Sequence, residues 1–575
     1  MIKLTKFLKP FQIPIYFVLS LVLVQSLAEL YLPTLMADIV DKGVVTGDTD
    51  YIWKIGGLML LVAAVGMICS IVASFYSAKA ASGFGKLLRS KIFSHVGNFS
   101  LHEFDKLGTA SLITRTTNDI TQVQQVLIMM LRMMVMAPMM CIGGIIMALS
   151  KDAKLTLVLA VSLPVLVITI VVIARKGMPL FKAMQVKLDK LNRVLRENLT
   201  GIRVIRSFNR VNHEKKRFDE ANWDLTQTAI KVNKLMAAMM PIMMIVLNLT
   251  TVAIIWFGGI RISNGHMEVG DMMAFIQYAM QIMFSFVMLS MMFVMIPRAS
   301  VSAVRINEVF ETTADIQDPT APVLTKEQKG QVEFQNVTFS YPGAEMPAIS
   351  NISFTMKPGE VTAIIGGTGS GKSTLINLIP RFYDVDSGKV LVNGVDVSEM
   401  TQESLREKIG FVPQQAVLFT GTIAENIRYG KEDATDKEVE HAAEIAQATE
   451  FIRDMPEGFH SVIAQGGTNV SGGQKQRLSI ARALVRKPEI YIFDDSFSAL
   501  DFKTDAKLRA ALKAETVSSS MLIVAQRVST IMDADQIIVL DNGKITGIGN
   551  HKELIETCKV YREIVMSQLS EEEIA

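Results

Sequence analysis

The chain has 575 residues, of which 50% are apolar and 20% are charged. This composition is too apolar for a wholly soluble protein and too charged for one that lies wholly in a membrane, so the two characters belong to different parts of the chain. The net charge of +2 indicates no nucleic-acid partner, and the three scattered cysteines argue against a disulfide framework or a thiolate metal site.

The N-terminal half holds six apolar runs, each long enough to cross about 30 Å of hydrocarbon at about 1.5 Å per residue. They lie near residues 13–35, 55–76, 128–149, 155–174, 236–260 and 270–296. The first run is too long for the apolar part of a signal peptide and lacks a small-residue cleavage site. It is therefore predicted to be the first membrane helix, entered through a short amphipathic segment at 4–10.

The connections between the runs differ in length. Those after the second and fourth runs have about 50 to 60 residues and few helix breakers, whereas the others are short. We expect the helices to continue beyond the membrane through the long connections. The connection after the fourth run carries about fifteen Lys and Arg, but the one after the first carries only Lys42 and Lys54. By the positive-inside rule, the long connections and both termini are cytoplasmic.

A transmembrane domain is thus predicted over residues 1–311, ending in a short helical stretch at 301–311 after Pro297. Residues 312–330 form a polar linker. From residue 331 to residue 575, strand-like and helix-like segments alternate, as in a soluble α/β domain. The predicted fold class is a polytopic membrane domain of six α-helices followed by an α/β P-loop NTPase domain.

The second domain contains a phosphate loop. An apolar strand at 361–365 is followed by a sequence that fits G-x-x-x-x-G-K-[ST] and leads into a helix. The glycines let backbone N–H groups close around phosphate oxygens at a helix N-terminus, which favours anions. Lys372 can reach the β- and γ-phosphates of ATP, and Ser373 can ligate Mg²⁺. The predicted ATP-binding residues here are Gly366, Gly367, Thr368, Gly369, Ser370, Gly371, Lys372, Ser373 and Thr374.

A second apolar strand, at 490–494, ends in Asp494. A carboxylate at a strand end beside a phosphate loop is placed to hold Mg²⁺, as the Walker B aspartate does.

Between these motifs lies Val470-Ser-Gly-Gly-Gln-Lys-Gln-Arg477. It resembles the signature sequence of ATP-binding cassette (ABC) proteins, in which Leu usually stands first. Its glycines are expected to open a helix, which again suits phosphate. The resemblance implies that the signature contacts the γ-phosphate of a nucleotide held by a partner's phosphate loop, so that two cassettes enclose two nucleotides. The signature residues are Val470, Ser471, Gly472, Gly473 and Gln474.

The resemblance covers the whole chain. Tyr341 matches the aromatic residue that stacks on adenine, and Gln414 matches the Q-loop glutamine that contacts Mg²⁺ and faces the membrane domain. Asp501 ends a Ser-Ala-Leu-Asp segment that matches the D-loop at the cassette interface. Residues 201–210 are similar to the second cytoplasmic loop of six-helix ABC exporters.

Two positions depart from the family's pattern. Asp495 stands where the family has the Glu that acts as general base. Its side chain is one methylene shorter, so its carboxylate should lie more than about 1 Å short of the position needed to align the attacking water, which can lower the rate about 100-fold. Gln526 stands where the family has a switch histidine, and a glutamine cannot relay a proton. Gln465 is a softer change, because exporters commonly have Glu there.

This combination resembles the degenerate-site subunit of heterodimeric bacterial multidrug exporters. It implies a site that binds ATP and Mg²⁺ but hydrolyses ATP slowly, with Asp495, Gln526 and Gln414 at the catalytic positions. It also implies a second, non-identical half-transporter that completes a competent site with this chain's signature. The expected location is a bacterial plasma membrane, and the expected substrates are hydrophobic or cationic small molecules.

The sequence leaves two alternative functions to consider besides export of small molecules. A lipid or peptide exporter half has the same architecture, so it stays an alternative. A nucleotide-gated channel or regulator would need a continuous polar lining, and the sixth run offers few polar residues, such as Gln277, Ser285 and Ser290, among many Met and Phe.

The membrane runs also suggest a substrate path. Many of the 35 Met lie in these runs, and flexible thioethers can adapt to varied apolar ligands, although packing or lipid contact accounts for most of them. Gln25 and Glu29 lie one helical turn apart inside the first run. Because an intramembrane carboxylate normally faces a cavity or a partner, both residues are candidates for lining the path.

Overall fold

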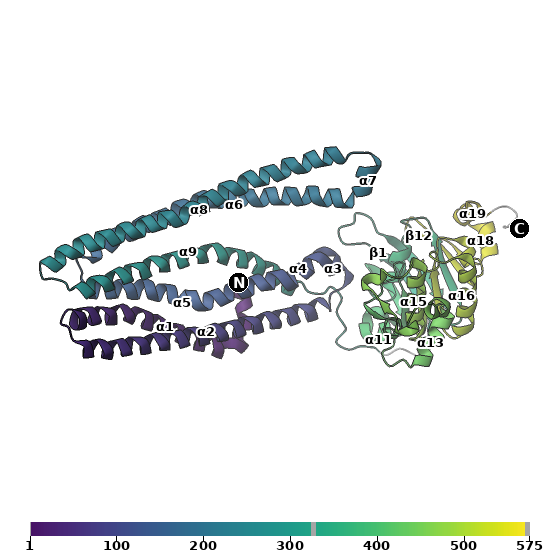
Figure 1. Ribbon diagram of the computed structural model, residues 1–575. Helices are drawn as coiled ribbons and strands as arrows, with labels where there is room; N and C mark the ends of the chain where they lie inside the picture. The colour runs from purple at the N-terminus through teal and green to yellow at the C-terminus, as the bar shows by residue number, and fades with distance from the viewer. Residues whose placement is uncertain (1, 324–328, 570–575) are drawn as a thin grey trace. The chain divides into compact units, whose positions relative to one another are not determined.

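The computed structural model describes residues 2–323 and 329–569, so residues 324–328 of the predicted linker lie outside the described residues. The chain divides into two compact units (Figure 1). The first comprises Met1–Gly97 and Thr109–Thr312, and the second comprises Asn98–Gly108 and Thr313–Ala575.

Six long helices make up most of the first unit. They are α1 (Gln12–Asp38), α2 (Thr49–Val96), α5 (Ile120–Lys151), α6 (Thr156–Thr200), α8 (Val211–Ser263) and α9 (Val269–Glu311). Each belongs to a helical segment long and apolar enough to cross a membrane, which confirms the six predicted spans. With 48 and 53 residues, α2 and α8 are roughly 70 and 80 Å long. They therefore extend well beyond the hydrocarbon, and the long connections are helical as predicted.

Shorter helical pieces join the long helices. They are η1 (Ile2–Phe11), which contains the predicted amphipathic segment, the π-helical turns η2 (Ile39–Val44) and η3 (Arg115–Asp119), α4 (Thr109–Thr114) and α7 (Ile202–Ser207).

The end of α9 differs from the prediction. Residues 301–311 were expected to form a separate short helix after Pro297, but they continue α9 to Glu311. Proline removes only one backbone donor from a helix, and α9 packs along α5. This contact holds the helix together across the proline.

The long helices of the first unit form two groups. α1, α2, α5 and α9 pack against one another, whereas α6 and α8 pack mainly on each other (Figure 1). Within the first group, Ala73, Ala80 and Ala81 of α2 are almost completely buried. Small residues at such positions let helix backbones approach closely.

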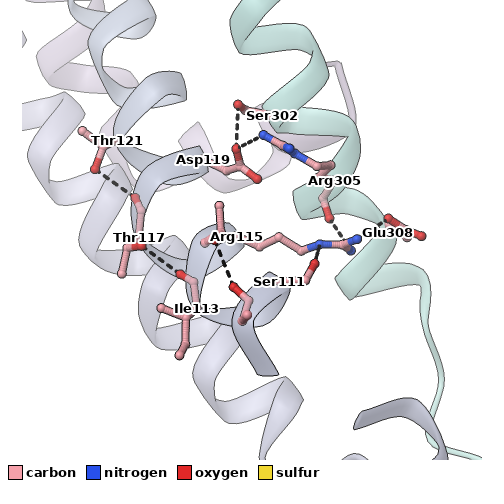
Figure 2. A network of polar contacts seen from close by, with 11 residues as sticks. Ser111, Ile113, Arg115, Thr117, Asp119, Thr121, Ser302, Arg305 and Glu308 are labelled. Atoms are coloured by element: carbon pink, nitrogen blue, oxygen red, sulfur yellow. Dashed lines mark hydrogen bonds and ion pairs between the residues drawn. The ribbon is translucent and has the colours of Figure 1, made fainter. Parts of the chain in front are cut away.

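A polar network joins the start of α5 to the end of α9 (Figure 2). Asp119, the last residue of η3, is 1% exposed and accepts hydrogen bonds from Ser302 Oγ at 2.8 Å and from the Arg305 guanidinium. Arg115 pairs with Glu308 at 2.8 Å and donates to the main-chain oxygen of Arg305 at 3.2 Å. These bonds fix the register of α9 against the π-helical turn.

Two larger sheets and a two-stranded one build the second unit. The six-stranded sheet has the order β12-β11-β3-β10-β9-β6 and is parallel except for β12. The four-stranded sheet has the order β2-β1-β4-β5 and is antiparallel. β7 pairs with β8. The strands are β1 (Val332–Phe339), β2 (Ile349–Met356), β3 (Val361–Gly366), β4 (Ser387–Val392), β5 (Val395–Asp396), β6 (Ile409–Val412), β7 (Gly421–Thr422), β8 (Val462–Ile463), β9 (Ile490–Asp494), β10 (Ser520–Val524), β11 (Gln536–Asp541) and β12 (Lys544–Gly549).

Helices cover the parallel sheet. They include α10 (Lys372–Leu378), α11 (Gln402–Glu407), α12 (Ile423–Arg428), α13 (Asp436–Ile445), α14 (Thr449–Arg453), α15 (Gly472–Leu484), α16 (Phe502–Glu515), α17 (Val528–Ile531), α18 (His551–Thr557) and α19 (Lys559–Met566). The same unit contains α3 (Leu101–Leu107) and the 3₁₀ turns η4 (Val397–Glu399), η5 (Gly458–His460) and η6 (Gln465–Gly467).

Strand β9 shows how the sequence specifies a doubly covered sheet. All five of its residues are buried. Tyr491 and Phe493 pack into one apolar cluster, and Ile490 and Ile492 pack into the other. Because neighbouring side chains of a strand point to opposite faces, an unbroken apolar run is needed when both faces are covered. The α/β prediction for this domain is confirmed.

Candidate nucleotide site

Three neighbouring parallel strands bring the predicted site residues to one edge of the sheet. β3, β10 and β9 lie side by side and end at Gly366, Val524 and Asp494. The carboxyl ends of parallel strands share one edge, where α/β proteins bind their ligands. The segments after these strands contain the phosphate loop, Gln526 and Asp495.

The phosphate loop follows β3 and precedes α10, as predicted. Gly371 has φ of 97°, and a Cβ there would lie 2.7 Å from Ile349 Cγ2 and 2.9 Å from the main-chain oxygen of Ala348. At Gly366 a Cβ would lie 2.2 Å from the main-chain oxygen of Leu540. Both positions therefore require glycine, because any side chain would push the loop away from the sheet.

The loop surrounds a half-buried cation. Lys372 Nζ donates to the main-chain oxygens of Gly366 at 2.8 Å and Gly367 at 2.7 Å. Desolvation by burial lowers the pKa of Lys372, and the charges of Asp495 and Asp494 oppose this shift only in part. Ser370 Oγ is buried and has no hydrogen-bond partner within the described residues. A half-buried ammonium and a hydroxyl without a partner, both in a glycine-rich turn, fit a polyphosphate.

Oxygen ligands for Mg²⁺ lie beside the loop. Ser373 Oγ donates to Asp494 Oδ1 at 3.5 Å, and Asp494 is 8% exposed. Burial raises the pKa of Asp494, and a bound cation would favour its ionised form. A hydroxyl and a carboxylate side by side suit Mg²⁺, so Ser373 and Asp494 fit the predicted metal role, with Gln414 near enough to contribute.

Most of the predicted nucleotide residues line one cavity of about 380 Å³. Its walls also include Ala348 and Val524, which the sequence did not single out. The lining residues are Tyr341, Ala348, Thr368, Gly369, Gly371, Lys372, Ser373, Thr374, Gln414, Asp494, Asp495, Val524 and Gln526. Gly366, Gly367 and Ser370 belong to the same loop. The structure thus brings together residues that lie up to 185 positions apart, from Tyr341 to Gln526.

The two positions that depart from the family's pattern meet in this cavity. Asp495 Oδ2 accepts from Gln526 Nε2 at 3.2 Å and from Gln414 Nε2 at 3.5 Å. Burial raises the pKa of Asp495. Asp495 also has φ of 47°, a left-handed conformation that Asp tolerates better than most residues. Its carboxylate is therefore held by two amides.

Tyr341 lies at the rim of the cavity and is 37% exposed. Its hydroxyl is 3.1 Å from Thr374 Oγ1. Its ring makes edge contacts with Phe339 and Tyr383 at 5.1 and 5.5 Å between centroids. An exposed ring fixed in this way can stack on a flat ligand.

The signature and the D-loop lie elsewhere. Ser471 caps α15, accepting from Gln474 N at 3.3 Å, while Gln474 Oε1 accepts from Ser471 N at 2.8 Å. The predicted helix start is therefore confirmed. Asp501 caps α16 by accepting from Thr504 N at 3.0 Å, a hydrogen bond that lowers its pKa. Within the described part of the chain, neither Val470–Gln474 nor Asp501 lines the cavity.

Three residues that support the site were missed from the sequence. Gln568 donates to the main-chain oxygen of Gln526 and accepts from Val528 N, both at 2.8 Å. Gln476 of α15 donates to the main-chain oxygen of Pro413, the neighbour of Gln414, at 3.3 Å. Ser496 Oγ donates to the main-chain oxygen of Val412 at 3.2 Å. No sequence pattern pointed to Gln568, because it follows no motif and lies 42 residues from Gln526.

The two candidate residues of the substrate path lie in α1. Gln25 is 6% exposed and donates to Glu29 Oε1 at 2.8 Å. Gln281 of α9, which the sequence did not single out, donates to the main-chain oxygen of Glu29 at 3.1 Å.

Comparison with known proteins agrees with these features. Residues 15–286 match the family profile described as ABC transporter transmembrane region, and residues 349–498 match the ABC transporter profile. An uncharacterized ABC transporter ATP-binding protein of Mycobacterium tuberculosis is 44% identical over 98% of this chain and 97% of its own length. Another, YfiB of Bacillus subtilis, is 40% identical over 99% of both chains.

Relatives with named cargoes are more distant. A fatty acid ABC transporter ATP-binding/permease protein of Mycobacterium tuberculosis is 34% identical over 83% of this chain and 75% of its own length. YgaD of Bacillus subtilis, a candidate multidrug export ATP-binding/permease protein, is 32% identical over 98% of both chains.

A solved structure shares the fold. It is a bacterial Atm1-family ABC exporter with ATP bound, which superposes with a TM-score of 0.81 and 26% identity over 97% of this chain and 98% of the other. The chain is therefore a member of the ABC transporter family, an exporter-type half-transporter in which a multi-pass plasma-membrane domain is joined to an ATPase domain that drives transport.

Proposed function

We propose that this chain is the degenerate-site subunit of a heterodimeric exporter of amphipathic compounds. The observation that carries the proposal is the contact between Asp495 and Gln526 beside a complete phosphate loop. The loop retains the groups that hold a nucleotide. The two positions that would activate and position the attacking water carry residues unsuited to these tasks.

Each departure affects hydrolysis for a physical reason. The Asp495 carboxylate is one methylene short and is held by the amides of Gln414 and Gln526, so it is a poorly placed base. Gln526 can donate to a phosphate oxygen but carries no titratable proton. ATP supplies the energy for transport when it is bound, with Mg²⁺ held by Ser373, Asp494 and Gln414. The chain's own residues would bind this nucleotide and cleave it slowly.

A slow site of this kind needs a partner. The signature Val470–Gln474 lies outside this chain's own cavity and has an intact helix cap. It is therefore available to a nucleotide on another cassette. We infer that the partner supplies a competent base and switch residue, and that this chain's signature completes the competent site.

The orientation and cargo follow from the same reasoning. The basic connection of about fifteen Lys and Arg after the fourth span supports a cytoplasmic location for the long helical connections, both termini and the ATPase domain. Cassette closure would then move the extended helices between inward- and outward-facing states. The named relatives include both fatty acid and multidrug transporters, so hydrophobic or cationic amphipaths are the proposed substrates.

The proposal is tested by purifying this chain from its native membrane with its partner and measuring ATP turnover. The chain alone should turn over ATP at least about tenfold more slowly than the pair, since a base misplaced by roughly 1 Å can lower the rate about 100-fold. Mutation of the partner's catalytic Glu should abolish ATP turnover by the heterodimer. Fast turnover by the unmodified chain alone, stimulated by amphipaths, would contradict the proposal.

A further inference from the structure

Proline 33 leaves one backbone oxygen of the first membrane helix without its usual donor. In an α-helix the N–H of residue 33 would donate to the main-chain oxygen of Glu29, but proline has no N–H. Pro33 lies inside α1. The side-chain amide of Gln281, on α9, takes over this bond at 3.1 Å. Gln281 is thereby held beside Glu29.

The carboxylate of Glu29 is fixed but not neutralised. Gln25, one turn earlier, donates to Glu29 Oε1 at 2.8 Å and is itself 6% exposed. Among the described residues, the hydrogen bond to the Glu29 carboxylate comes from this amide, which carries no charge. An intramembrane carboxylate normally pairs with a cation or faces a path for one.

Hydrogen-bond acceptors are in surplus at this point. Gln281 Oε1 is buried and has no donor within the described part of the chain, and no other described side chain donates to the second carboxylate oxygen of Glu29. Buried acceptors are normally satisfied. One buried acceptor without a donor, next to a half-buried carboxylate, forms a site that lacks a positively charged donor.

We propose that Gln25, Glu29 and Gln281 form a cargo site for amphipathic organic cations that carry an N–H group. The Glu29 carboxylate pairs with the ammonium, Gln281 Oε1 accepts one of its N–H hydrogens, and the Gln25 amide orients the carboxylate. This inference rests on the proposed export of amphipaths and narrows it. A fatty acid anion would meet like charge at Glu29.

The test uses four fluorescent probes that share one dansyl-alkyl body. Their head groups are a primary ammonium, its N-acetyl amide, a trimethylammonium and a carboxylate. Binding to the purified full-length transporter, with its partner, is followed by dansyl fluorescence. The wild type should bind the primary ammonium at least about tenfold more tightly than the amide, because charge-assisted hydrogen bonds are about twice as strong as neutral ones. The trimethylammonium should fall between them, and the carboxylate should bind weakest.

Variants separate recognition from packing. Glu29→Gln should weaken binding of the ammonium about tenfold and change binding of the amide less than about twofold, whereas Glu29→Asp should retain part of the preference. Thr34→Val is the matched control. Thr34 Oγ1 lies 2.6 Å from the Tyr278 hydroxyl, so this change removes another contact between the same two helices and should leave the probe order intact.

The outcomes distinguish this inference from the function on which it rests. Equal binding of the ammonium and amide by the wild type, or equal losses for both in Glu29→Gln, would overturn the cation site even if ATP-driven transport persists. The wild-type comparison stands even if Glu29→Gln does not fold. If no probe is moved in an ATP-dependent manner, export of amphipaths itself is wrong, whichever head group binds best.

Discussion

The side-chain amide of Gln526 lies 3.2 Å from Oδ2 of Asp495, so the two substituted positions of the ATP site contact each other directly. Gln526 follows β10 and Asp495 follows β9, and these strands are paired in parallel register. The main-chain N–H of Asp495 also donates to the main-chain oxygen of Val524 at 2.9 Å. The backbone thus positions both side chains whatever their identity. The Glu and His that the family has at these two positions can therefore be reintroduced by mutation.

Restoring the family residues should restore hydrolysis. In the chain purified alone, Asp495→Glu with Gln526→His should raise ATP turnover at least about tenfold, because the longer carboxylate reaches the attacking water and the imidazole can carry a proton. Phosphate release measures the rate. Asp533→Glu, at an exposed carboxylate outside the cavity, is the control. No gain in the double variant, with ATP binding retained, would show that these two residues do not limit the rate.

Nucleotide binding should survive although hydrolysis is slow. Lys372→Ala removes the ammonium that the loop surrounds, so photolabelling of this chain by an azido-ATP should fall at least about tenfold, given contributions of about 1.5–3 kcal/mol from hydrogen bonds to charged groups. Lys357→Ala, at an exposed lysine that pairs with Glu360, should label like the wild type. Undiminished labelling of Lys372→Ala would refute the assignment of the phosphate loop.

The signature should serve the partner's site. Ser471→Arg places bulk and charge at the start of α15, where a γ-phosphate on the other cassette would approach, and should remove most steady-state ATPase activity of the pair. Thr435→Arg is a matched control, because Thr435 caps α13 through the same reciprocal bonds with Glu438. It removes a cap, worth about 1 kcal/mol, but no signature contact. Similar activity in both variants would argue against the arrangement in trans.

The local features of the ATP site could be predicted because they depend on local sequence. The strand at 361–366 and the loop after it are specified by an apolar run followed by glycines at fixed spacing, and the start of α15 is specified by the cap between Ser471 and Gln474. Each depends on residues within a few positions. The same holds for the six membrane spans, whose lengths follow from the hydrocarbon thickness.

Contacts between distant segments could not be predicted in this way. Gln568 donates a hydrogen bond to the main-chain oxygen of Gln526, 42 residues away in the sequence. Gln281 donates one to the main-chain oxygen of Glu29, 252 residues away. No periodicity marks either residue, because their role depends on which helices and strands become neighbours. The continuation of α9 through Pro297 was mispredicted for a similar reason, since packing against α5 outweighs the local break.

The half-buried His551, which contacts the buried Tyr561, should make the ATPase domain sensitive to acid. Burial lowers the pKa of His551, with Asp533 opposing the shift, and His551 Nδ1 lies 2.7 Å from the Tyr561 hydroxyl. The unfolded chain therefore takes up a proton at higher pH than the folded one, and stability falls as the pH drops through the usual histidine pKa towards the lower folded value. Melting of the purified chain at pH 7.5 and 5.5 should show a smaller loss in His551→Gln. His460→Gln, at an exposed histidine, is the control and should lose as much stability at low pH as the wild type. If His551→Gln also loses as much stability as the wild type, His551 is not a source of the acid sensitivity.

The network between the start of α5 and the end of α9 should hold these two helix ends in register (Figure 2). Arg305→Ala removes the guanidinium that compensates the buried Asp119 and leaves Ser302 as a neutral donor to Oδ1. Oδ2 has no partner among the described residues even in the wild type. Removing one partner of a buried charge is costly, but Arg305 is itself about half exposed. We therefore expect the free energy of unfolding to fall by about 2 kcal/mol.

Asp119→Asn combined with Arg305→Ala should recover part of that loss, since no charge remains buried. Arg217→Ala, at an exposed pair with Glu197, should lose less than about 1 kcal/mol. Denaturation of the purified chain in detergent compares the wild type with these three variants. A double variant no more stable than Arg305→Ala would show that the charge of Asp119 is not what the arginine compensates.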